Sequence, residues 1–333
     1  MKSIRLNGGY GLENIHVENI EVPTLSAGQV LVKVQAVSLN RLDLMIAQGA
    51  FRTSLPHTLG SDATGEVVAI GSGVTHLTVG DRVVTHFIQD WQAGQLQDSY
   101  LKNRLGTDVQ GVFSEYVALA ERALVKVPSN LTSAQVATLP IAGVSAWEAL
   151  INIGKLQSGQ TVLLQGTGGG SILALQFAKA IGAKVIITSG KDEKLEKAKA
   201  LGADQTINYL AYPKWQEKVL QLTEGKGVDL ALEMSWASLE KTVEAMRLGG
   251  KIIVVGLLGG ADTTLSVFGI MQKALSIHGM QVGSKASFQS MNHAIALHAI
   301  SPVVDRVFRL DQVSEAFNYL DKGEHFGKVV ITF

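Results

Sequence analysis

The chain has 333 residues, which is too long for one compact core of ordinary size and predicts two domains of roughly 150 residues each. Lys plus Arg equals Asp plus Glu at 29 each, so no net charge attracts nucleic acid or a membrane, and neither is an expected partner. The chain has no cysteine, which excludes disulfides, thiolate catalysis and zinc sites built on sulfur. The first fifteen residues lack the apolar core of a signal peptide, and no apolar run approaches the roughly 20 residues of a membrane span, so we expect a cytoplasmic protein.

Residues 1–127 predict a β-rich domain. Short runs of alternating apolar residues, interrupted by glycines, begin at Val30, Gly65 and Arg82. Period two at this spacing is typical of a barrel or a sandwich. After residue 130 the apolar residues recur at helical spacing, so we expect the first domain to end near residue 127.

Residues 128–284 predict strands and helices in alternation. The strands are apolar runs without alternation, as in a parallel sheet that helices cover on both faces, and this pattern indicates a doubly wound Rossmann fold. The expected strands are 161–165, 184–188, 205–208, 228–232, 251–255 and 276–282, and the expected helices are 171–181, 191–201, 215–222 and 239–247. The remaining residues, 285–333, are too few for a domain of their own and are expected to return to the first domain.

A glycine-rich turn follows the first of these strands. At this position a tight turn brings backbone N–H groups to a pyrophosphate at the N-terminus of a helix. We expect the cofactor to contact Thr167, Gly168, Gly169, Gly170 and Ser171. Ser171 replaces the third glycine of the usual pattern, and its small side chain suits close packing or donation to phosphate. The alternative is a glycine-rich connection that binds nothing.

The end of the second strand discriminates between NAD and NADP. An acid there bonds the ribose hydroxyls and repels a 2′-phosphate, but this chain has Ser189. Lys191 and Lys194 follow, and they are suited to pair with phosphate. The sequence therefore predicts NADP, with NAD as the less favoured cofactor; the alternative for the lysines is a solvated helix face.

Several motifs in the same order resemble the medium-chain dehydrogenase/reductase superfamily, especially its zinc-independent, quinone oxidoreductase-like members. Besides the glycine turn, they are His57–Val74, Gly80–Val83, Leu139–Trp147, Leu201–Tyr209 and Gly327–Ile331. The resemblance covers essentially the whole chain. It implies a GroES-like catalytic domain made of residues 1–127 and 285–333, joined to a Rossmann NADP-binding domain of residues 128–284.

The resemblance also implies contacts to the cofactor. In relatives, residues placed like Ser189, Lys194 and Tyr209 hold the 2′-phosphate side of NADP, and a hydroxyl residue placed like Ser145 contacts the nicotinamide. The complete further set is Ser145, Ser189, Lys194, Tyr209, Gly256, Leu257 and Lys328. The strand expected near residue 276 would be an exposed edge, and family members commonly pair two such edges, so we expect a homodimer.

Alcohol dehydrogenases of the superfamily bind catalytic zinc through cysteine and histidine. The corresponding places here are Asn40, Ser61 with Asp62, and Ile141. Amide, hydroxyl and alkyl groups do not make a three-ligand zinc site, so we expect no metal.

Without a Lewis acid, hydrogen bonds must activate the substrate while the cofactor carries the hydride. This favours NADPH-dependent reduction of a quinone, enone or other activated C=C or C=O substrate, with Asn40 as the donor. The alternative for Asn40 is a loop amide that bonds to the backbone and orients the neighbouring turn. Candidate substrate-binding residues are Phe51, at the place of a tyrosine in some relatives, with Ser61, His86 and Trp91. For His86 and Trp91 a buried packing role is the alternative. The alternative functions are a zinc-less alcohol or aldehyde oxidoreductase and a non-catalytic NADP-binding protein.

Overall fold

The structure, a computed structural model, describes residues 1–258 and 262–333, apart from the side chain of Leu257. Contacts divide these residues into two compact units. Unit 1 contains Met1–Val144 and Val282–Phe333, and unit 2 contains Ser145–Gln281. In the described ranges, no helix is both long and apolar enough to span a membrane.

The first boundary between the units lies after residue 144 and not near residue 127. Helix α2 (Ser133–Val136) begins after Thr132, whose hydroxyl accepts a hydrogen bond from the backbone N–H of Gln135 at 3.3 Å. Ala137, directly after this helix, packs with Ala36 and Val330 in a buried apolar cluster of unit 1. The helical segment after residue 130 therefore belongs to unit 1, because it packs on that unit's sheet.

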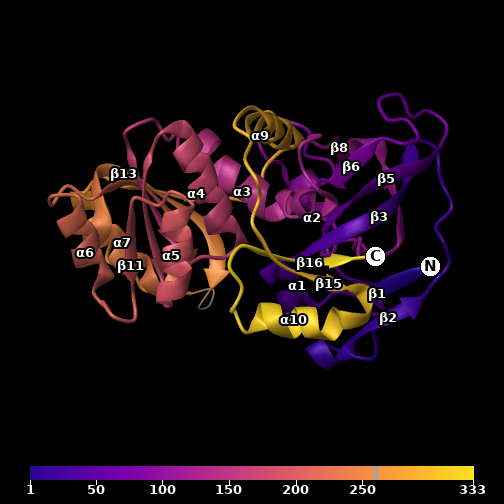
Figure 1. The fold of residues 1–333 in the computed structure, drawn as a ribbon, viewed down its shortest axis with the longest axis horizontal. Helices are drawn as coiled ribbons and strands as arrows, with labels where there is room; N and C mark the ends of the chain where they lie inside the picture. The colour runs from indigo at the N-terminus through magenta and orange to yellow at the C-terminus, as the bar shows by residue number, and fades with distance from the viewer. Residues whose placement is uncertain (259–261) are drawn as a thin grey trace. The chain divides into compact units, whose positions relative to one another are not determined.

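Unit 1 is built mainly of β-strands, as the alternating apolar pattern predicts (Figure 1). Its larger sheet has the described order β15-β16-β3-β5-β6-β8, and β7 pairs with β3. The bounds of these strands are β3 Gln29–Leu39, β5 Asp62–Ile70, β6 Arg82–Thr85, β7 Tyr116–Ala120, β8 Leu124–Lys126, β15 Val304–Arg309 and β16 Lys328–Thr332. A smaller sheet contains β1 Lys2–Leu6, β2 Ile15–Asn19 and β4 His57–Thr58.

The helices of unit 1 connect and cover these strands. The α-helices besides α2 are α1 Arg41–Ala47, α9 Lys285–Leu297 and α10 Val313–Asp321. Helix α10 packs against β16, and Phe317 and Leu320 on its inner face are buried. The returning C-terminal segment thus adds two strands and two helices to a unit that the N-terminal residues begin.

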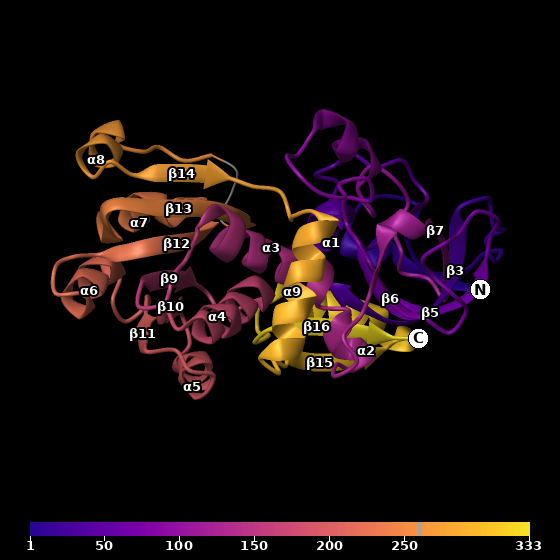
Figure 2. The same ribbon diagram turned by 90° about the horizontal axis from the view of Figure 1, so that it is seen from above.

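Unit 2 is a parallel sheet whose described order is β11-β10-β9-β12-β13-β14, and Figure 2 shows the strands following one another in this order. The bounds are β9 Thr161–Gln165, β10 Lys184–Ser189, β11 Gln205–Asn208, β12 Val228–Ser235, β13 Met246–Leu258 and β14 Ser276–Gly279. The α-helices wholly within unit 2 are α4 Gly169–Ile181, α5 Asp192–Ala200, α6 Trp215–Leu222, α7 Leu239–Ala245 and α8 Val267–Gln272. This confirms the predicted Rossmann sheet, although β13 is longer and β14 shorter than expected.

The central strands of the sheet in unit 2 are buried on both faces, which explains why they are uninterrupted apolar runs. Trp215 and Val219 of α6 pack with Leu239 and Val243 of α7 against one face. The alternate strand residues, which point to the opposite face, are also buried; they include Val162, Leu164, Val185 and Ile187.

Candidate functional site

Unit 1 contains a buried polar cluster where three strands meet. Ser38 of β3 pairs with Asp62 of β5 on one side and with Val330 of β16 on the other. Since β16 runs antiparallel to β3, its first residue, Lys328, lies beside Asn40, the residue that follows β3. The register of this sheet therefore gathers polar side chains that are far apart in the sequence. The cluster consists of Asn40, Asp43, Ser61, Asp62 and Lys328, all buried.

Lys328 is the cation of this polar cluster. Its side chain is only 5% exposed, and Nζ donates hydrogen bonds to the backbone oxygen of Leu39 and to Oδ1 of Asn40, each at 2.6 Å. Burial lowers the pKa of Lys328, while Asp62 and Asp43 oppose this shift. The resemblance places Lys328 at the cofactor, which stays a prediction; within unit 1 its ammonium contacts Leu39 and Asn40.

The two carboxylates of the polar cluster accept backbone hydrogen bonds. Asp43 Oδ2 accepts the N–H of Asn40 at 2.7 Å, and Asp62 Oδ2 accepts the N–H of Ile141 at 3.3 Å. Asp62 also accepts a hydrogen bond from the Ser61 hydroxyl at 2.8 Å. Burial raises the pKa of Asp62 and raises that of Asp43 to about 7. Asp43 Oδ1 is buried and has no hydrogen-bond partner among the described residues.

The other predicted substrate residues of unit 1 are more dispersed. Phe51 lies on an exposed turn after α1. His86 is wholly buried, its Nε2 lies 3.2 Å from the backbone oxygen of Trp91, and burial lowers its pKa to about 4. Trp91 is also buried, and its Nε1 donates to the backbone oxygen of Gly94 at 2.9 Å. For His86 and Trp91 the structure favours the packing alternative.

The glycine turn of unit 2 lies between β9 and α4, as predicted. Gly166 has φ of 71°, a conformation that favours glycine, and Gly168 is the N-cap of α4, which begins at Gly169 and not at Ser171. Thr167 and Ser171 are buried. The hydroxyl of Ser171 donates to the backbone oxygen of Gln165 at 2.7 Å, so it fastens the helix to the strand end. Of the two roles considered for Ser171, the structure shows the packing role.

The carboxyl ends of β10 and β11 bring together the residues predicted for the 2′-phosphate side. The backbone N–H of Tyr209 donates to the backbone oxygen of Ser189 at 3.1 Å. A Cβ atom on Gly190 would lie 2.9 Å from the Tyr209 hydroxyl, so this phenol lies directly over the turn. Tyr209 is 42% exposed, and Lys194 lies half-buried in the first turn of α5. Ser189 is buried at the end of its strand.

Three further predicted cofactor residues lie elsewhere in unit 2. Ser145 is buried at the start of the unit. A Cβ atom on Gly256 would lie 2.8 Å from the backbone oxygen of Met234, so glycine permits the close approach of β12 and β13 there. Leu257 belongs to β13, and its side chain lies outside the described residues.

Sequence reasoning missed a buried network at the ends of β9 and β12. Glu233 accepts hydrogen bonds from Gln165 at 3.0 Å and Thr242 at 2.5 Å through Oε2, and from Ser238 at 3.1 Å through Oε1. Burial raises the pKa of Glu233, and these donors oppose the shift. A glutamate within the apolar run of β12 was the signal for this network. The network supports the strand end from which the glycine turn starts.

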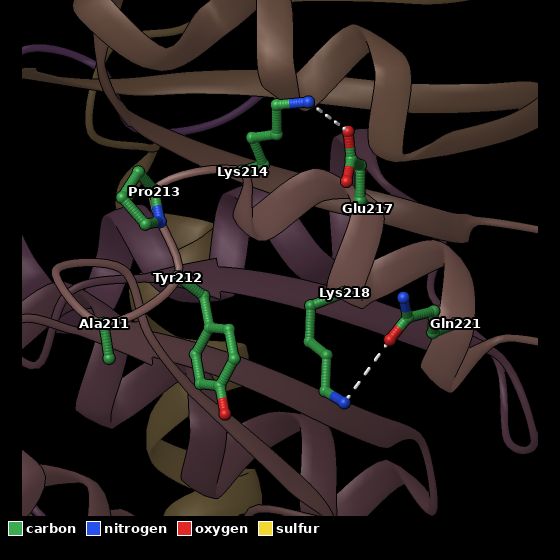
Figure 3. A pocket seen from close by; sticks show the side chains of 7 residues that line it. All are labelled: Ala211, Tyr212, Pro213, Lys214, Glu217, Lys218 and Gln221. Carbon is green, nitrogen blue, oxygen red and sulfur yellow. Dashed lines mark hydrogen bonds and ion pairs between the residues drawn. The ribbon is translucent and has the colours of Figure 1, made fainter.

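A small pocket of about 300 Å³ lies at the N-terminal end of α6 (Figure 3). It is lined by Ala211, Tyr212, Pro213, Lys214, Glu217, Lys218 and Gln221. Figure 3 shows Lys214 directed to Glu217 and Lys218 directed to Gln221; the Nζ–O distances are 3.0 Å and 3.4 Å. None of these residues is a predicted site residue.

Comparisons with known proteins place both units in one family. Residues 26–129 match the family model described as the alcohol dehydrogenase GroES-like domain, and residues 170–297 match the zinc-binding dehydrogenase model. A zinc-type alcohol dehydrogenase-like protein of Schizosaccharomyces pombe is 39% identical over 96% of both chains, and the quinone oxidoreductase of Homo sapiens is 28% identical over 99% of this chain and 97% of its own. The crystal structure of an NAD-dependent alcohol dehydrogenase is 32% identical and superposes with a TM-score of 0.92 over 100% of each chain. The chain belongs to the medium-chain dehydrogenase/reductase superfamily and is an oxidoreductase that uses a nicotinamide cofactor.

Proposed function

We propose that the protein is an NADPH-dependent reductase of quinones, enones or related substrates with an activated C=C or C=O bond, and that it works without zinc. The observation that carries this proposal is the ammonium of Lys328, which lies 2.6 Å from Oδ1 of Asn40. Asn40 occupies a place where the alcohol dehydrogenases of the superfamily have a zinc ligand. A buried ammonium at hydrogen-bond distance from this oxygen opposes the binding of a second cation there.

The donor set also does not fit zinc. The side chains at the corresponding places, Asn40, Ser61 and Ile141, are an amide, a hydroxyl and an alkyl group. Asp62 is the carboxylate beside them, and its oxygens already accept the Ser61 hydroxyl and the Ile141 N–H. Zinc sites in proteins use thiolate, imidazole or carboxylate ligands. We therefore assign no catalytic step to a metal.

Reduction of a conjugated carbonyl needs few protein groups. When bound, NADPH would supply a hydride to the β-carbon; the C=C electron pair would then join the α-carbon to the carbonyl carbon, and the C=O π pair would become the negative charge on oxygen. The chain's own task is to stabilise the negative charge on that oxygen, and we assign this task to one Nδ2 hydrogen of Asn40. A proton from solvent then adds to the α-carbon and completes the reduction. Oxidation of a simple alcohol fits less well, because nothing in this set lowers the pKa of the alcohol.

Three features of unit 2 support the preference for NADPH. The strand end has Ser189 where an acid would repel a 2′-phosphate, and Lys191 is exposed directly after it. The phenol of Tyr209 lies over the same turn. The nearest acid along the chain, Asp192, accepts a hydrogen bond from the Asn208 amide at 2.7 Å, which holds its carboxylate at the end of β11.

We also propose a homodimer that forms through β14. In the described part of the sheet β14 is an edge strand, and its backbone pairs with β13 on one side. Helix α8, which precedes β14, exposes apolar side chains: Val267 is 74% exposed, Phe268 64% and Met271 69%. An unpaired edge beside exposed apolar side chains suits a two-fold contact that covers both copies at once.

A hydride-transfer assay tests the proposed function. Oxidation of NADPH is followed with 1,4-naphthoquinone or 2-cyclohexen-1-one, and the reverse reaction is followed with benzyl alcohol and NADP. We expect turnover of the quinone or the enone, unchanged by a chelator. Turnover of the alcohol alone would favour the zinc-less alcohol oxidoreductase. Tight NADPH binding without turnover of any compound would favour a non-catalytic nucleotide-binding protein.

A further inference from the structure

Lys328 and Asn40 are 288 positions apart in the chain, yet they form one of the shortest side-chain contacts of the buried polar cluster in unit 1. The pairing of Val329 with Leu39 brings them together, since the next residue on each side is Lys328 and Asn40. Nζ of Lys328 donates to the backbone oxygen of Leu39 as well as to the Asn40 side chain, both at 2.6 Å. The backbone contact fixes the ammonium, and the fixed ammonium defines where the amide oxygen lies.

The other end of the Asn40 amide faces a backbone oxygen. Its Nδ2 lies 3.5 Å from the oxygen of Ser38. An ammonium only donates and a carbonyl oxygen only accepts, so the amide has one favourable orientation between them. The contact with Ser38 is at the limit of a hydrogen bond. The Asn40 N–H in this weak contact is therefore the one that can donate to a substrate oxygen with the smallest loss of hydrogen-bond energy.

Stability alone does not account for this arrangement. Removing Lys, Asp and Asp side chains from water costs several kcal/mol per ion, and well-packed apolar residues often stabilise a protein as much or more. Asp43 Oδ1 has no hydrogen-bond partner within the described chain, so the cluster is not even fully satisfied. The burial of these charged groups around the Asn40 amide, at a cost in stability, indicates that the orientation of this amide matters for function.

We infer that Lys328 is a positioning residue of the reaction: it clamps the amide of Asn40 through the amide oxygen, so that an N–H is directed to the carbonyl oxygen of the substrate. This inference rests on the proposed function, because it assumes that Asn40 donates to that oxygen. Lys328 itself does not touch the substrate in this scheme. Lys328 restricts the rotation of the Asn40 side chain, so that its amide is already oriented for the substrate.

A double-mutant cycle tests whether Lys328 acts through Asn40. The turnover number is measured with NADPH and 2-cyclohexen-1-one for Asn40→Ala, Lys328→Met and the double variant. We expect Asn40→Ala to lower kcat roughly 100-fold, as for the loss of one oxyanion donor, and Lys328→Met to lower it about tenfold or more. The double variant is expected to match Asn40→Ala alone. If the two losses multiply, or if Lys328→Met keeps kcat within about twofold of the parent, the positioning role is wrong.

Two further variants separate positioning from folding. The double variant Lys328→Met/Asp62→Asn removes the charges of Lys328 and Asp62 together, so we expect it to fold like the parent protein. We expect its kcat to stay low, and recovery of the parent kcat would overturn the inference. Lys273→Met is the matched control, because Nζ of Lys273 also donates to protein carbonyl groups, those of Val243 at 3.1 Å and Met246 at 2.9 Å, far from Asn40 in the sequence and in unit 2. We expect Lys273→Met to keep kcat.

A readout independent of turnover distinguishes this inference from the proposed function. The side-chain amide signals of Asn40, identified in a proton–nitrogen spectrum by their loss in Asn40→Ala, are expected to shift in Lys328→Met and to exchange faster with water. Unchanged signals would refute the clamp whatever the activity. Shifted signals together with a normal kcat in Asn40→Ala would instead show that the clamp exists but that the proposed donor role is wrong.

Discussion

The cofactor preference is open to a direct test at the end of β10. With Ser189 and no acid at this position, NADPH is expected to bind at least about tenfold tighter than NADH, a difference of about 1.4 kcal/mol. In Ser189→Asp, a carboxylate would lie close to the 2′-phosphate. At about 4 Å, one such pair of charges costs about 1 kcal/mol in water and about 4 kcal/mol near a protein surface. Tyr209 and Lys191 beside this position are exposed, so solvent screens the repulsion. We therefore expect Ser189→Asp to reduce the binding free energy of NADPH by about 1 to 2 kcal/mol.

The assay is a fluorescence titration of NADPH and NADH. Ser189→Asp should weaken NADPH binding roughly fivefold to thirtyfold and leave NADH bound as well as before or better. Ser189→Asn has nearly the same shape without the charge and serves as the control. Lys194→Ala should weaken NADPH and leave NADH nearly unchanged, since NADH lacks the phosphate. Equal dissociation constants for the two cofactors in the parent protein, or equal losses in the Asp and Asn variants, would refute this reasoning.

Three more outcomes are expected. Elemental analysis of the purified protein should find no stoichiometric zinc, and one zinc per chain would contradict the account of the polar cluster. Light scattering should give twice the mass of the 35.5 kDa chain, and Phe268→Lys should give the mass of one chain; a parent protein that is already monomeric would exclude the contact through β14. Burial lowers the pKa of His86 from 6.5 to about 4, so the folded protein binds a proton at this imidazole less tightly than the unfolded chain does. The free energy of unfolding is therefore highest above pH 6.5, and about 3 kcal/mol of it is lost as the pH falls to about 4. Denaturant unfolding should show a flatter pH dependence in this window for His86→Gln, while the exposed His16→Gln serves as the control and keeps the parent's slope.

The secondary structure of unit 2 could be predicted closely from the sequence. The strand at 205–208 and the helix at 215–222 have the predicted bounds, because their apolar periods are clear and turn residues flank them. The domain boundary could not be predicted as well. The segment after residue 130 has a helical period, but the period does not say which sheet the helix will cover. Ala137 packs with Ala36 and Val330, and that contact depends on strand register.

The candidate site was predictable in part. Asn40 was identified through the resemblance to the superfamily, and the strand ends that hold Ser189 and Tyr209 follow from the order of a doubly wound sheet. The partner of Asn40 was not predictable, because a lysine near the end of the chain gives no local signal that it is buried. Its contact arises only when β16 pairs with β3.

The late position of Lys328 in the chain has a consequence for folding during synthesis. Unit 2 is one continuous stretch, Ser145–Gln281, and its strands are all available once residue 281 has been made. Unit 1 has Asp43 and Asp62 early, but the lysine that neutralises them comes 288 positions after Asn40. Until β16 adds to the sheet, these carboxyl groups have no buried cation, so the nascent N-terminal segment is expected to stay open and hydrated around them. The last strand of the chain thus closes the sheet and the charge cluster in a single event, and we expect unit 1 to acquire its native structure after unit 2 on the ribosome.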